Sequence, residues 1–497
     1  MFYAMIVVFL LGYTAIALEH PLKLEKAASA LLTGVLTWVL FVFGVQEMIP
    51  TKEAFWEYLH EQGFLNNLTQ AEFLHHVEEV GFLAMVKSAE FKEFIASSYV
   101  YAKGGVVSAY LDFVGHHELL HHLGEISEIL FFLLGAMTIV EIVDQHQGFR
   151  VITDKIKTTN RVKLLWILSI LTFFMSAALD NLTTTIVMVA LLRKLVADQK
   201  TRWFFASMIV LAANAGGAWS PIGDVTTIML WVKGQVTTIP IIRDVILPSL
   251  VTMVVPLILL SFTQKGTVER PVVKTDEGEF TTPFERVFIL IMGVSSLLFV
   301  PVFKTITHLP PYMGMLFGLG TMWTVTEIMH RDKIIGVKRR LKVSGILTRV
   351  DVPTVLFFLG ILTAVAALDS AGHLDILAGW LNDVTNQNIY FINLGIGLLS
   401  AIVDNVPLVA GAMGMYDIAP PDAVGKAALY MVDGQFWQFL AYCAGTGGSI
   451  LIIGSAAGVA AMGMEKIDFI WYMKRISLLA MLGYFAGAAA YYLMFGL

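Results

Sequence analysis

Two aspartate–asparagine pairs stand at the junctions of long apolar runs, where acidic residues are costly. They occur in Ser-x-x-x-Asp180-Asn181 and in Ser-x-x-x-Asp404-Asn405, and the aspartates are 224 positions apart (404 − 180) in a chain of 497 residues. A carboxylate inside the hydrocarbon region of a membrane costs roughly 2.5–3.5 kcal/mol on insertion scales. Two such acids at matching places in two halves indicate a pair of ion sites in a transporter built from a repeated unit.

A segment rich in glycine, residues 214–227, follows the first pair inside another apolar stretch. Glycine and proline break a membrane helix and free backbone groups that must find other partners. A broken helix facing a hairpin tip forms a cage near the membrane midplane, where oxygen-only ligands suit Na⁺ or Li⁺ better than a soft metal. The predicted oxygen ligands are the carboxylates of Asp180 and Asp224, the side chains of Asn214, Thr226 and Thr227, and the carbonyls of Gly217 and Gly223.

The second pair is predicted to form a separate site with another Gly-rich run, residues 445–449. There Gly448 offers a carbonyl and Ser449 a hydroxyl, while Ser455 stands where the first half has Asp224. The two sites are therefore expected to be unequal, one with two acids and the other with one acid and hydroxyl groups.

Each buried acid could be neutralised either by a proton or by a cation. Competition for one carboxylate would couple the movement of protons and cations in opposite directions. The sequence thus predicts Na⁺ binding at Asp180, Asp224 and Asp404.

The composition is that of a membrane protein. The chain is 57% hydrophobic and 14% charged, with a mean hydropathy of +0.73, whereas about a quarter of the residues in soluble domains are charged. The single cysteine, Cys443, excludes an intrachain disulfide and a Cys-rich metal or redox centre. No motif for ATP, haem or flavin is present. We therefore expect a carrier rather than an enzyme, with no cofactor beyond its transported ions and no nucleic-acid partner.

Apolar runs predict ten membrane spans, and the first, near the N-terminus, is expected to be retained because no basic region precedes it. The candidate spans are residues 2–18, 27–47, 127–144, 204–232, 244–262, 287–303, 312–328, 353–369, 428–462 and 476–495.

Charge placement predicts two re-entrant hairpins that enter the membrane from opposite sides. Segments 145–163 and 193–202 are basic and predicted to be cytoplasmic, so the apolar stretch 164–192 between them must return to its own side. Its arms, of about a dozen residues each, are too short to cross comfortably. Stretch 389–415 lies between segments almost free of Lys and Arg, which are predicted to be external. The two halves therefore form an inverted-topology repeat.

Sequence echoes support the duplication. Residues 132–138 recur as 357–363, and the glycines of 216–223 recur in 447–454. Such order at a near-constant offset is the signature of an internal repeat. The predicted domains are N-terminal helices 1–47, a polar extracytoplasmic insertion 48–126, a first repeat 127–263 with hairpin 164–192 and broken helix 204–232, a cytoplasmic linker 264–286, and a second repeat 287–497 with hairpin 389–415 and broken helix 428–462.

The insertion is acidic and rich in histidine, and its role stays open. Histidines titrate near neutrality, so His116, His117, His121 and His122 could sense pH. Their spacing would also allow metal capture, and a polar helix face without a special role is the third reading. Glu141, near a span end, is either interfacial or a proton relay.

At these motifs the chain resembles the NhaD-type sodium/proton antiporters of the ion transporter superfamily. The resemblance covers most of the membrane part, from residue 125 onward, and is carried by segments 133–141, 179–184, 217–224 and 403–407. It implies exchange of cytoplasmic Na⁺ or Li⁺ for external H⁺ at alkaline pH, a bacterial inner membrane, and a homodimer. By position it implies a transport site of Asp180, Asn181, Asn214, Asp224, Thr226, Thr227, Ser400, Asp404, Asn405 and Ser449.

Two other functions fit part of these motifs. A sodium-coupled carboxylate or other anion carrier of the same superfamily would have a similar layout, but an aspartate at each hairpin tip would repel an anion. An intramembrane aspartyl protease would use two membrane aspartates, yet the Gly-x-Gly-Asp motif of such enzymes is incomplete at Gly223-Asp224.

Overall fold

A computed structural model describes residues 1–17, 19, 23–48, 55, 58, 111–153, 155–271, 281–331, 333, 336–337, 341–402 and 404–496. Within this part of the chain the regular structure is helical, and the one extended pairing is an isolated bridge between Asn160 and Thr267. The chain forms two compact units, residues 1–127 with 356–376, and residues 128–355 with 377–497. Most of the predicted insertion 48–126 lies outside the described residues.

Seven helical stretches of the described residues are long and apolar enough to cross a membrane. The chain is therefore an all-α polytopic membrane protein, as its composition predicts. These stretches are α3 (Lys26–Phe43), the π-helical η2 (Phe113–Leu119) continued by α10 (Leu120–Gln145), α12 (Arg161–Leu179), α16 (Thr238–Thr263), α17 (Pro283–Thr307), α21 (Val352–Ser370) and α28 (Ser477–Phe495).

The unit formed by residues 1–127 and 356–376 is built on close helix crossings. Helix α1 (Phe2–Ala17) packs on α3, which continues into the short α4 (Val45–Met48). Gly34 of α3 and Gly360 of α21 meet where these helices cross, since a Cβ on Gly34 would lie 2.6 Å from the Gly360 carbonyl oxygen. Small residues at such crossings let membrane helices approach closely.

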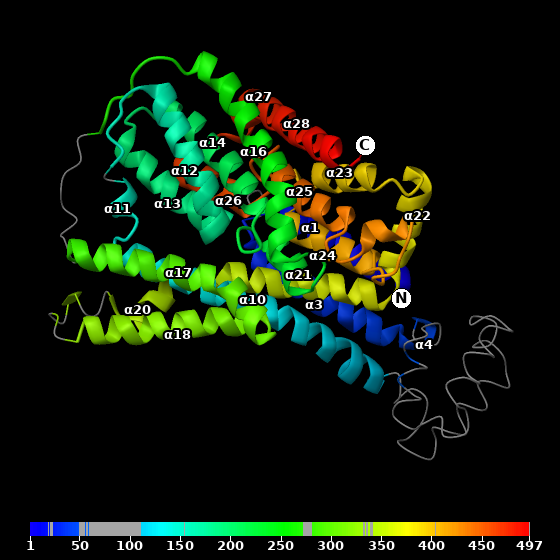
Figure 1. Cartoon of the computed structure of the whole chain (residues 1–497). Helices are drawn as coiled ribbons and strands as arrows, with labels where there is room; N and C mark the ends of the chain where they lie inside the picture. Colours follow the sequence, from blue (N-terminus) through cyan, green and yellow to red (C-terminus); the bar gives the residue numbers. More distant parts are fainter. Residues whose placement is uncertain are drawn as a thin grey trace, which may run out of the picture. The chain divides into compact units, whose positions relative to one another are not determined.

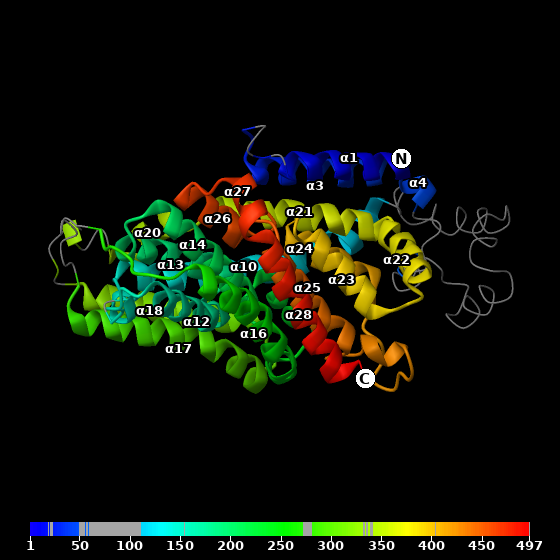
Figure 2. The same ribbon diagram turned by 90° about the horizontal axis from the view of Figure 1, so that it is seen from above.

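The other unit holds the remaining helices, and in it α17 and α18 run side by side (Figures 1 and 2). Its further elements are α11 (Arg150–Thr153), α13 (Asn181–Leu195), α14 (Gln199–Ala218), α15 (Val225–Val232), α18 (Pro311–Met329), α20 (Val343–Ile346), η3 (Leu347–Arg349), α23 (Ile389–Leu399), α24 (Asn405–Met415), η4 (Ala427–Tyr430), α25 (Gln435–Gly447), α26 (Ala456–Glu465), α27 (Phe469–Arg475) and most of α22 (His373–Thr385), which begins within residues 356–376.

The first hairpin consists of α12 and α13, joined at Asp180. Its arms have 19 and 15 residues, so the prediction of arms of about a dozen residues is wrong. The helices extend past the apolar limits because Asn160 caps α12 and basic residues continue both outer ends. At the outer end of α12, Arg161 Nη2 donates to Thr201 Oγ1 in the first turn of α14 at 2.9 Å, and just after α13, Ala197 N donates to Glu269 O at 2.9 Å. The chain thus returns to the end from which it entered.

The second hairpin consists of α23 and α24, each of 11 residues. These arms are as short as predicted. Beside them Lys426 Nζ lies 3.3 Å from Asn386 O, and Tyr416 donates to Asn382 at 3.2 Å, so both outer ends of this hairpin also lie together. How the two hairpins are oriented in a membrane stays a prediction.

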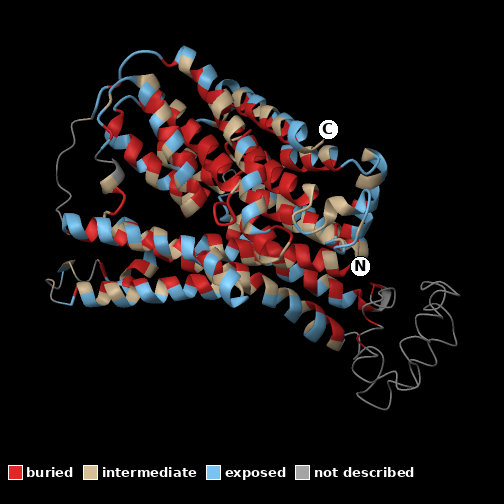
Figure 3. Ribbon diagram, in the orientation of Figure 1, coloured by how far each residue is buried: buried red, intermediate tan, exposed pale blue. Residues whose placement is uncertain are grey.

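Each hairpin packs against an interrupted helix. Helices α14 and α15 are separated by residues 219–224, and α25 and α26 by residues 448–455. The second interrupted helix begins at Gln435, later than the predicted start at residue 428, because residues 427–430 form the separate turn η4. Helix α25 is buried from Phe436 to Gly447 and α14 from Phe205 to Ala218, within the buried interior that Figure 3 shows.

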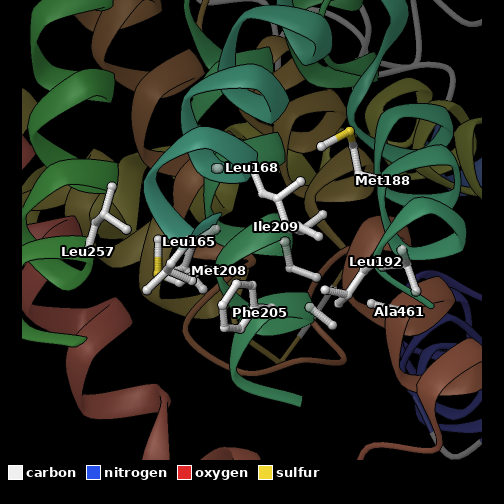
Figure 4. Close-up of a cluster of buried hydrophobic side chains, with 14 of the residues drawn as sticks. Leu165, Leu168, Met188, Leu192, Phe205, Met208, Ile209, Leu257 and Ala461 are labelled. Carbon is white, nitrogen blue, oxygen red and sulfur yellow. The ribbon is translucent and has the colours of Figure 1, made fainter. Parts of the chain in front are cut away.

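An apolar cluster fixes the first hairpin to these helices. Leu168 of α12 and Met188 and Leu192 of α13 meet Phe205 of α14 and Ala461 of α26, all of them nearly or fully buried (Figure 4). Burial of each such side chain contributes about 1.5–3 kcal/mol relative to exposure in water. In lipid, the close packing of these side chains also holds the hairpin in position against the neighbouring helices.

Candidate functional site

Serine hydroxyls dock each hairpin onto its broken helix in the same way. Ser176 donates to Ala213 O at 2.6 Å, and Ser400 donates to Ala444 O at 2.9 Å. At the next turn a glycine permits backbone contact, because a Cβ on Gly216 would overlap Phe173 O and one on Gly447 would overlap Gly397 O. The two halves thus repeat a local structure as well as a sequence pattern.

The aspartates of the site occupy helix N-caps. Asp180 caps α13 by accepting from Thr183 N at 2.7 Å and Thr183 Oγ1 at 2.8 Å, and Asp404 accepts from Val406 N at 3.3 Å at the start of α24. A helix N-terminus carries partial positive charge that stabilises an ionised carboxylate. Asp180 also has a φ of 84°, a strained conformation for a residue other than glycine.

Asp224 lies between the two hairpin tips and is 1% exposed. Its Oδ2 accepts from Asn181 Nδ2 at 2.6 Å, and Asn405 Nδ2 lies 3.5 Å from each of its oxygens. Its Oδ1 also accepts from Thr226 N at 3.0 Å and Thr226 Oγ1 at 2.9 Å, so Asp224 caps α15. One buried carboxylate is therefore held by amides from both halves of the chain.

Asn214 extends this network into the second broken helix. Its Nδ2 donates to Ser449 Oγ at 2.9 Å and to Ser455 Oγ at 2.8 Å, and its Oδ1 accepts from Asn181 at 3.0 Å. The polar side chains of the two halves thus form one connected network, whereas the sequence predicted two separate sites, and the number of ion sites stays a prediction. Two helix breaks that face each other place their polar groups at the same point.

The remaining predicted residues lie beside this network without a hydrogen bond into it. Thr227 Oγ1 is 3.5 Å from Ala218 O, and Ser400 serves the docking contact described above. Gly217, Gly223 and Gly448 are packed tightly at the two breaks, where a Cβ on Gly223 would lie 2.8 Å from the Cα of Gly217.

Glu141 lies away from the network, on α10, where it accepts from Gln145 Nε2 at 2.9 Å.

The histidine cluster straddles η2 and the start of α10. His116 and His121 are well exposed, with 72% and 68% of their side-chain surface accessible. His122 is more enclosed and lies 3.1 Å from Ser370 Oγ, which also donates to Glu118. No group of three or more metal-binding side chains occurs among the described residues. The pH-sensing role stays a prediction.

Sequence reasoning missed several residues next to the site. The Thr183 hydroxyl donates to the carboxylate of Asp180. Thr184 and Thr185 are buried, and their hydroxyls have no hydrogen-bond partner in the described part of the chain. The Thr-Thr-Thr run after Asp180-Asn181 was the available signal. Tyr472, whose hydroxyl donates to Ser449 O at 2.7 Å, gave no signal, because α27 is remote from the breaks in sequence.

Comparison with known proteins assigns the family. The family model described as a citrate transporter, CitMHS, matches residues 5–432. Sodium/proton antiporter 2 of Arabidopsis thaliana is 46% identical over 380 residues, which cover 75% of this chain and 87% of that protein. This chain belongs to the NhaD-type sodium/proton antiporter family. Its resemblance to that family, expected from the motifs, is confirmed.

Other members of the NhaD-type family show how far the likeness extends. Sodium/proton antiporter 1 of Arabidopsis thaliana is 50% identical over 376 residues, 75% of this chain and 63% of that protein. The matched part of the chain thus spans less than two thirds of that relative's length. The Na(+)/H(+) antiporter NhaD of Vibrio parahaemolyticus is 31% identical over 391 residues, 72% of this chain and 90% of that protein.

Proposed function

We propose that this protein exchanges Na⁺, or Li⁺, for H⁺ by alternating access. The observation that carries the proposal is the buried Asp224 carboxylate, held at 2.6 Å by Asn181 and approached by Asn405 from the other half. The printed names of its relatives, sodium/proton antiporters of plants and bacteria, support the same function.

The proposed ion site is centred on Asp224 and includes the hairpin tips and both helix breaks. Its side chains would be those that the motifs indicate. The carboxylates of Asp180, Asp224 and Asp404 would carry the negative charge that compensates the ion. The proposed members are Asp180, Asn181, Asn214, Asp224, Thr226, Thr227, Ser400, Asp404, Asn405, Ser449 and Ser455, with backbone oxygens of Gly217, Gly223 and Gly448.

Exchange follows from competition for buried carboxylates. Asp224 is shielded from water, so its charge must be balanced by a proton or by a cation. A cation that enters displaces the proton, and a returning proton displaces the cation, which couples their movements in opposite directions. The positive ends of α13, α15 and α24 limit the cost of ionising the three aspartates between exchanges.

The asparagine amides would contribute both when the site is empty of cation and when a cation is bound. In this structure Asn181 and Asn405 present Nδ2 to Asp224, which neutralises part of its charge by hydrogen bonding. Rotation of each amide by half a turn would present Oδ1 instead, and an amide oxygen is a ligand suited to a hard cation. The two amides can therefore change from donating hydrogen bonds to Asp224 to binding a cation, without movement of the backbone.

Several finer features belong to the proposal. An inverted-topology repeat, the domain limits given above and a proton-relay role for Glu141 are inferred from charge placement, apolar runs and residue position, and a homodimer is implied by the family resemblance. The protein is a multi-pass membrane protein, and a bacterial inner membrane is the proposed location, although similar proteins come from both plants and bacteria.

The test is ion-driven proton movement in proteoliposomes that contain the purified full-length protein. We expect Na⁺ and Li⁺, but not K⁺, to drive protons across the membrane from neutral to alkaline pH, and Asp180→Asn and Asp404→Asn to abolish it. Asparagine can cap a helix as aspartate does, so loss in these variants would report the missing charge. Citrate uptake without proton–cation exchange would overturn the proposal and favour the anion carrier.

A further inference from the structure

The second helix break contains a backbone carbonyl that needs an external partner. The carbonyl groups at the end of a helix have no intrahelical donor, and in a membrane there is little water to replace one. Helix α25 ends at Gly447, and Ser449 lies in the unwound segment that follows. The Ser449 carbonyl accepts a hydrogen bond at 2.7 Å from the hydroxyl of Tyr472, which is 0% exposed.

In the first half, the corresponding carbonyl is approached by a hydroxyl group from a different position. The breaks align at an offset of 231 (448 − 217), so Ser449 corresponds to Ala218 and Gly458 to Thr227. In the first half the Thr227 hydroxyl lies 3.5 Å from Ala218 O. The second half cannot use this arrangement, because a Cβ on Gly458 would overlap the carbonyl oxygen of Ile452. Tyr472, from α27, supplies the hydroxyl, and the residue at the equivalent position of the first half, Ile241 (472 − 231), has none.

The position of Tyr472 is fixed by its neighbours. Asp468 caps α27 by accepting from Trp471 N at 2.7 Å. The Trp471 ring packs edge-on against Trp203 and Phe204 of α14, with centroids 5.1 Å and 4.9 Å apart. The Tyr472 ring lies in the apolar cluster with residues of α12, α13 and α14. The hydroxyl therefore has little freedom to leave the Ser449 carbonyl.

The contact leads directly into the proposed ion site. The Ser449 side chain accepts from Asn214 at 2.9 Å, and Asn214 accepts from Asn181, which holds Asp224. We propose that Tyr472 is a positioning residue for transport, which fixes the Ser449 peptide and through it the orientation of Asn214. This inference rests on the proposed antiport function, because it assigns Tyr472 to the same site.

The test compares Tyr472→Phe with a matched control in purified full-length protein reconstituted in proteoliposomes. Tyr484→Phe is the control, because the Tyr484 hydroxyl is also in a buried side chain and donates to a carbonyl, Leu394 O at 3.1 Å, within regular helix α23. We expect Tyr472→Phe to raise the KM for Na⁺ about 3- to 10-fold with little change in maximal rate, as loss of one buried hydrogen bond implies. The control should leave KM unchanged.

A double-mutant cycle and a binding measurement complete the test. If Tyr472 acts through Ser449, Tyr472→Phe should add little to the KM of Ser449→Ala. In detergent the Na⁺ concentration that half-maximally raises the melting temperature should shift by the same factor as KM. An unchanged KM and unchanged Na⁺ response in Tyr472→Phe, with exchange by the wild type intact, would overturn the inference alone. Absence of both exchange and Na⁺ stabilisation in the wild type would instead overturn the proposed function, and the inference with it.

Discussion

The two halves of the site are alike at their hairpins and different at their helix breaks. Both hairpins carry an aspartate, an asparagine and a docking serine. At the breaks, positions 231 apart hold unlike residues. Asn214, Asp224, Thr226 and Thr227 of the first half correspond to Gly445, Ser455, Ala457 and Gly458 of the second. The comparison teaches that the two halves share a docking scaffold, while the first break carries the larger polar side chains and the second carries small residues against which they pack.

Room at the centre explains this division. A Cβ on Gly445 would already lie 3.1 Å from the Cβ of Ala218 and 3.8 Å from Asp224 Oδ2. Two large polar side chains at equivalent places would therefore collide, since the breaks face each other. This packing is consistent with the one central ion site that we propose, rather than two.

The largest effect is expected from removal of the central charge. Asp224→Asn should reduce exchange by about 100-fold or more, because the charge that balances the cation is lost and the hydrogen bonds from Asn181 and Thr226 are no longer charge-assisted. Ser455→Ala, at the equivalent position, should reduce exchange only a few-fold, since Ser455 is neutral and accepts one bond from Asn214 and one from Gly458 N at the start of α26. Proton flux in proteoliposomes measures both, and melting temperature controls for folding. Equal losses in the two variants would contradict the asymmetry.

A smaller effect is expected at the shared docking glycines. Gly216→Ala and Gly447→Ala should each destabilise the protein by about 1–3 kcal/mol, because the added methyl group meets a backbone carbonyl of the hairpin. Gly395→Ala, on α23 with no atom within 4 Å of a Cβ, is the control and should be neutral. Thermal unfolding in detergent is the measurement. A stable Gly447→Ala beside an unstable Gly216→Ala would show that the hairpins are not docked alike.

A still smaller effect, on the KM for Na⁺, is expected from substitution of Asn214. Asn214→Ala should raise the KM for Na⁺ about 10-fold, because it leaves two serine hydroxyls without their donor and frees Asn181. Asn405→Ala should have a smaller effect, as its contacts to Asp224 are 3.5 Å long. Kinetics over a range of Na⁺ concentrations separates the two. The reverse order would place the second half at the centre of the site.

The smallest effect concerns acid stability outside the site. His146 and His330, after α10 and α18, share a hydrogen bond at 2.7 Å near Lys333 and Glu285. Burial, with neighbouring His146 and Lys333, lowers the pKa of His330 to about 4, and burial also lowers that of His146. The unfolded chain binds protons more readily below its usual histidine pKa of about 6.5.

Stability should therefore fall as pH drops from about 6.5 toward 4, since folding then excludes protons that the unfolded chain takes up. The second half has Ala371 where the first has His146 (146 + 225), so the histidine pair, which joins His146 to His330 of the second repeat, is not duplicated. Melting temperature against pH should show the loss in the wild type and a weaker dependence in His330→Gln. Parallel curves for both proteins would exclude the pair as its source.

Local patterns predicted much of this molecule. Apolar runs gave nearly all the long helices, and the Gly-rich motifs gave both interruptions. Helix ends were less accurate, as in the first hairpin, because polar residues such as Arg161 and Lys194 continue a helix beyond its apolar part. Asp224 and Asn214 were found as site residues because both polar side chains occur inside an interrupted apolar run.

The sequence by itself determined the all-helical membrane class, the repeated motifs and the polar residues near the helix breaks, since hydropathy and glycine act over short stretches of chain. Only the tertiary structure decided that the two motif sets form one network and that Tyr472 reaches Ser449. Those contacts join residues up to 241 positions apart. They depend on the packing of helices against one another, which no local pattern encodes.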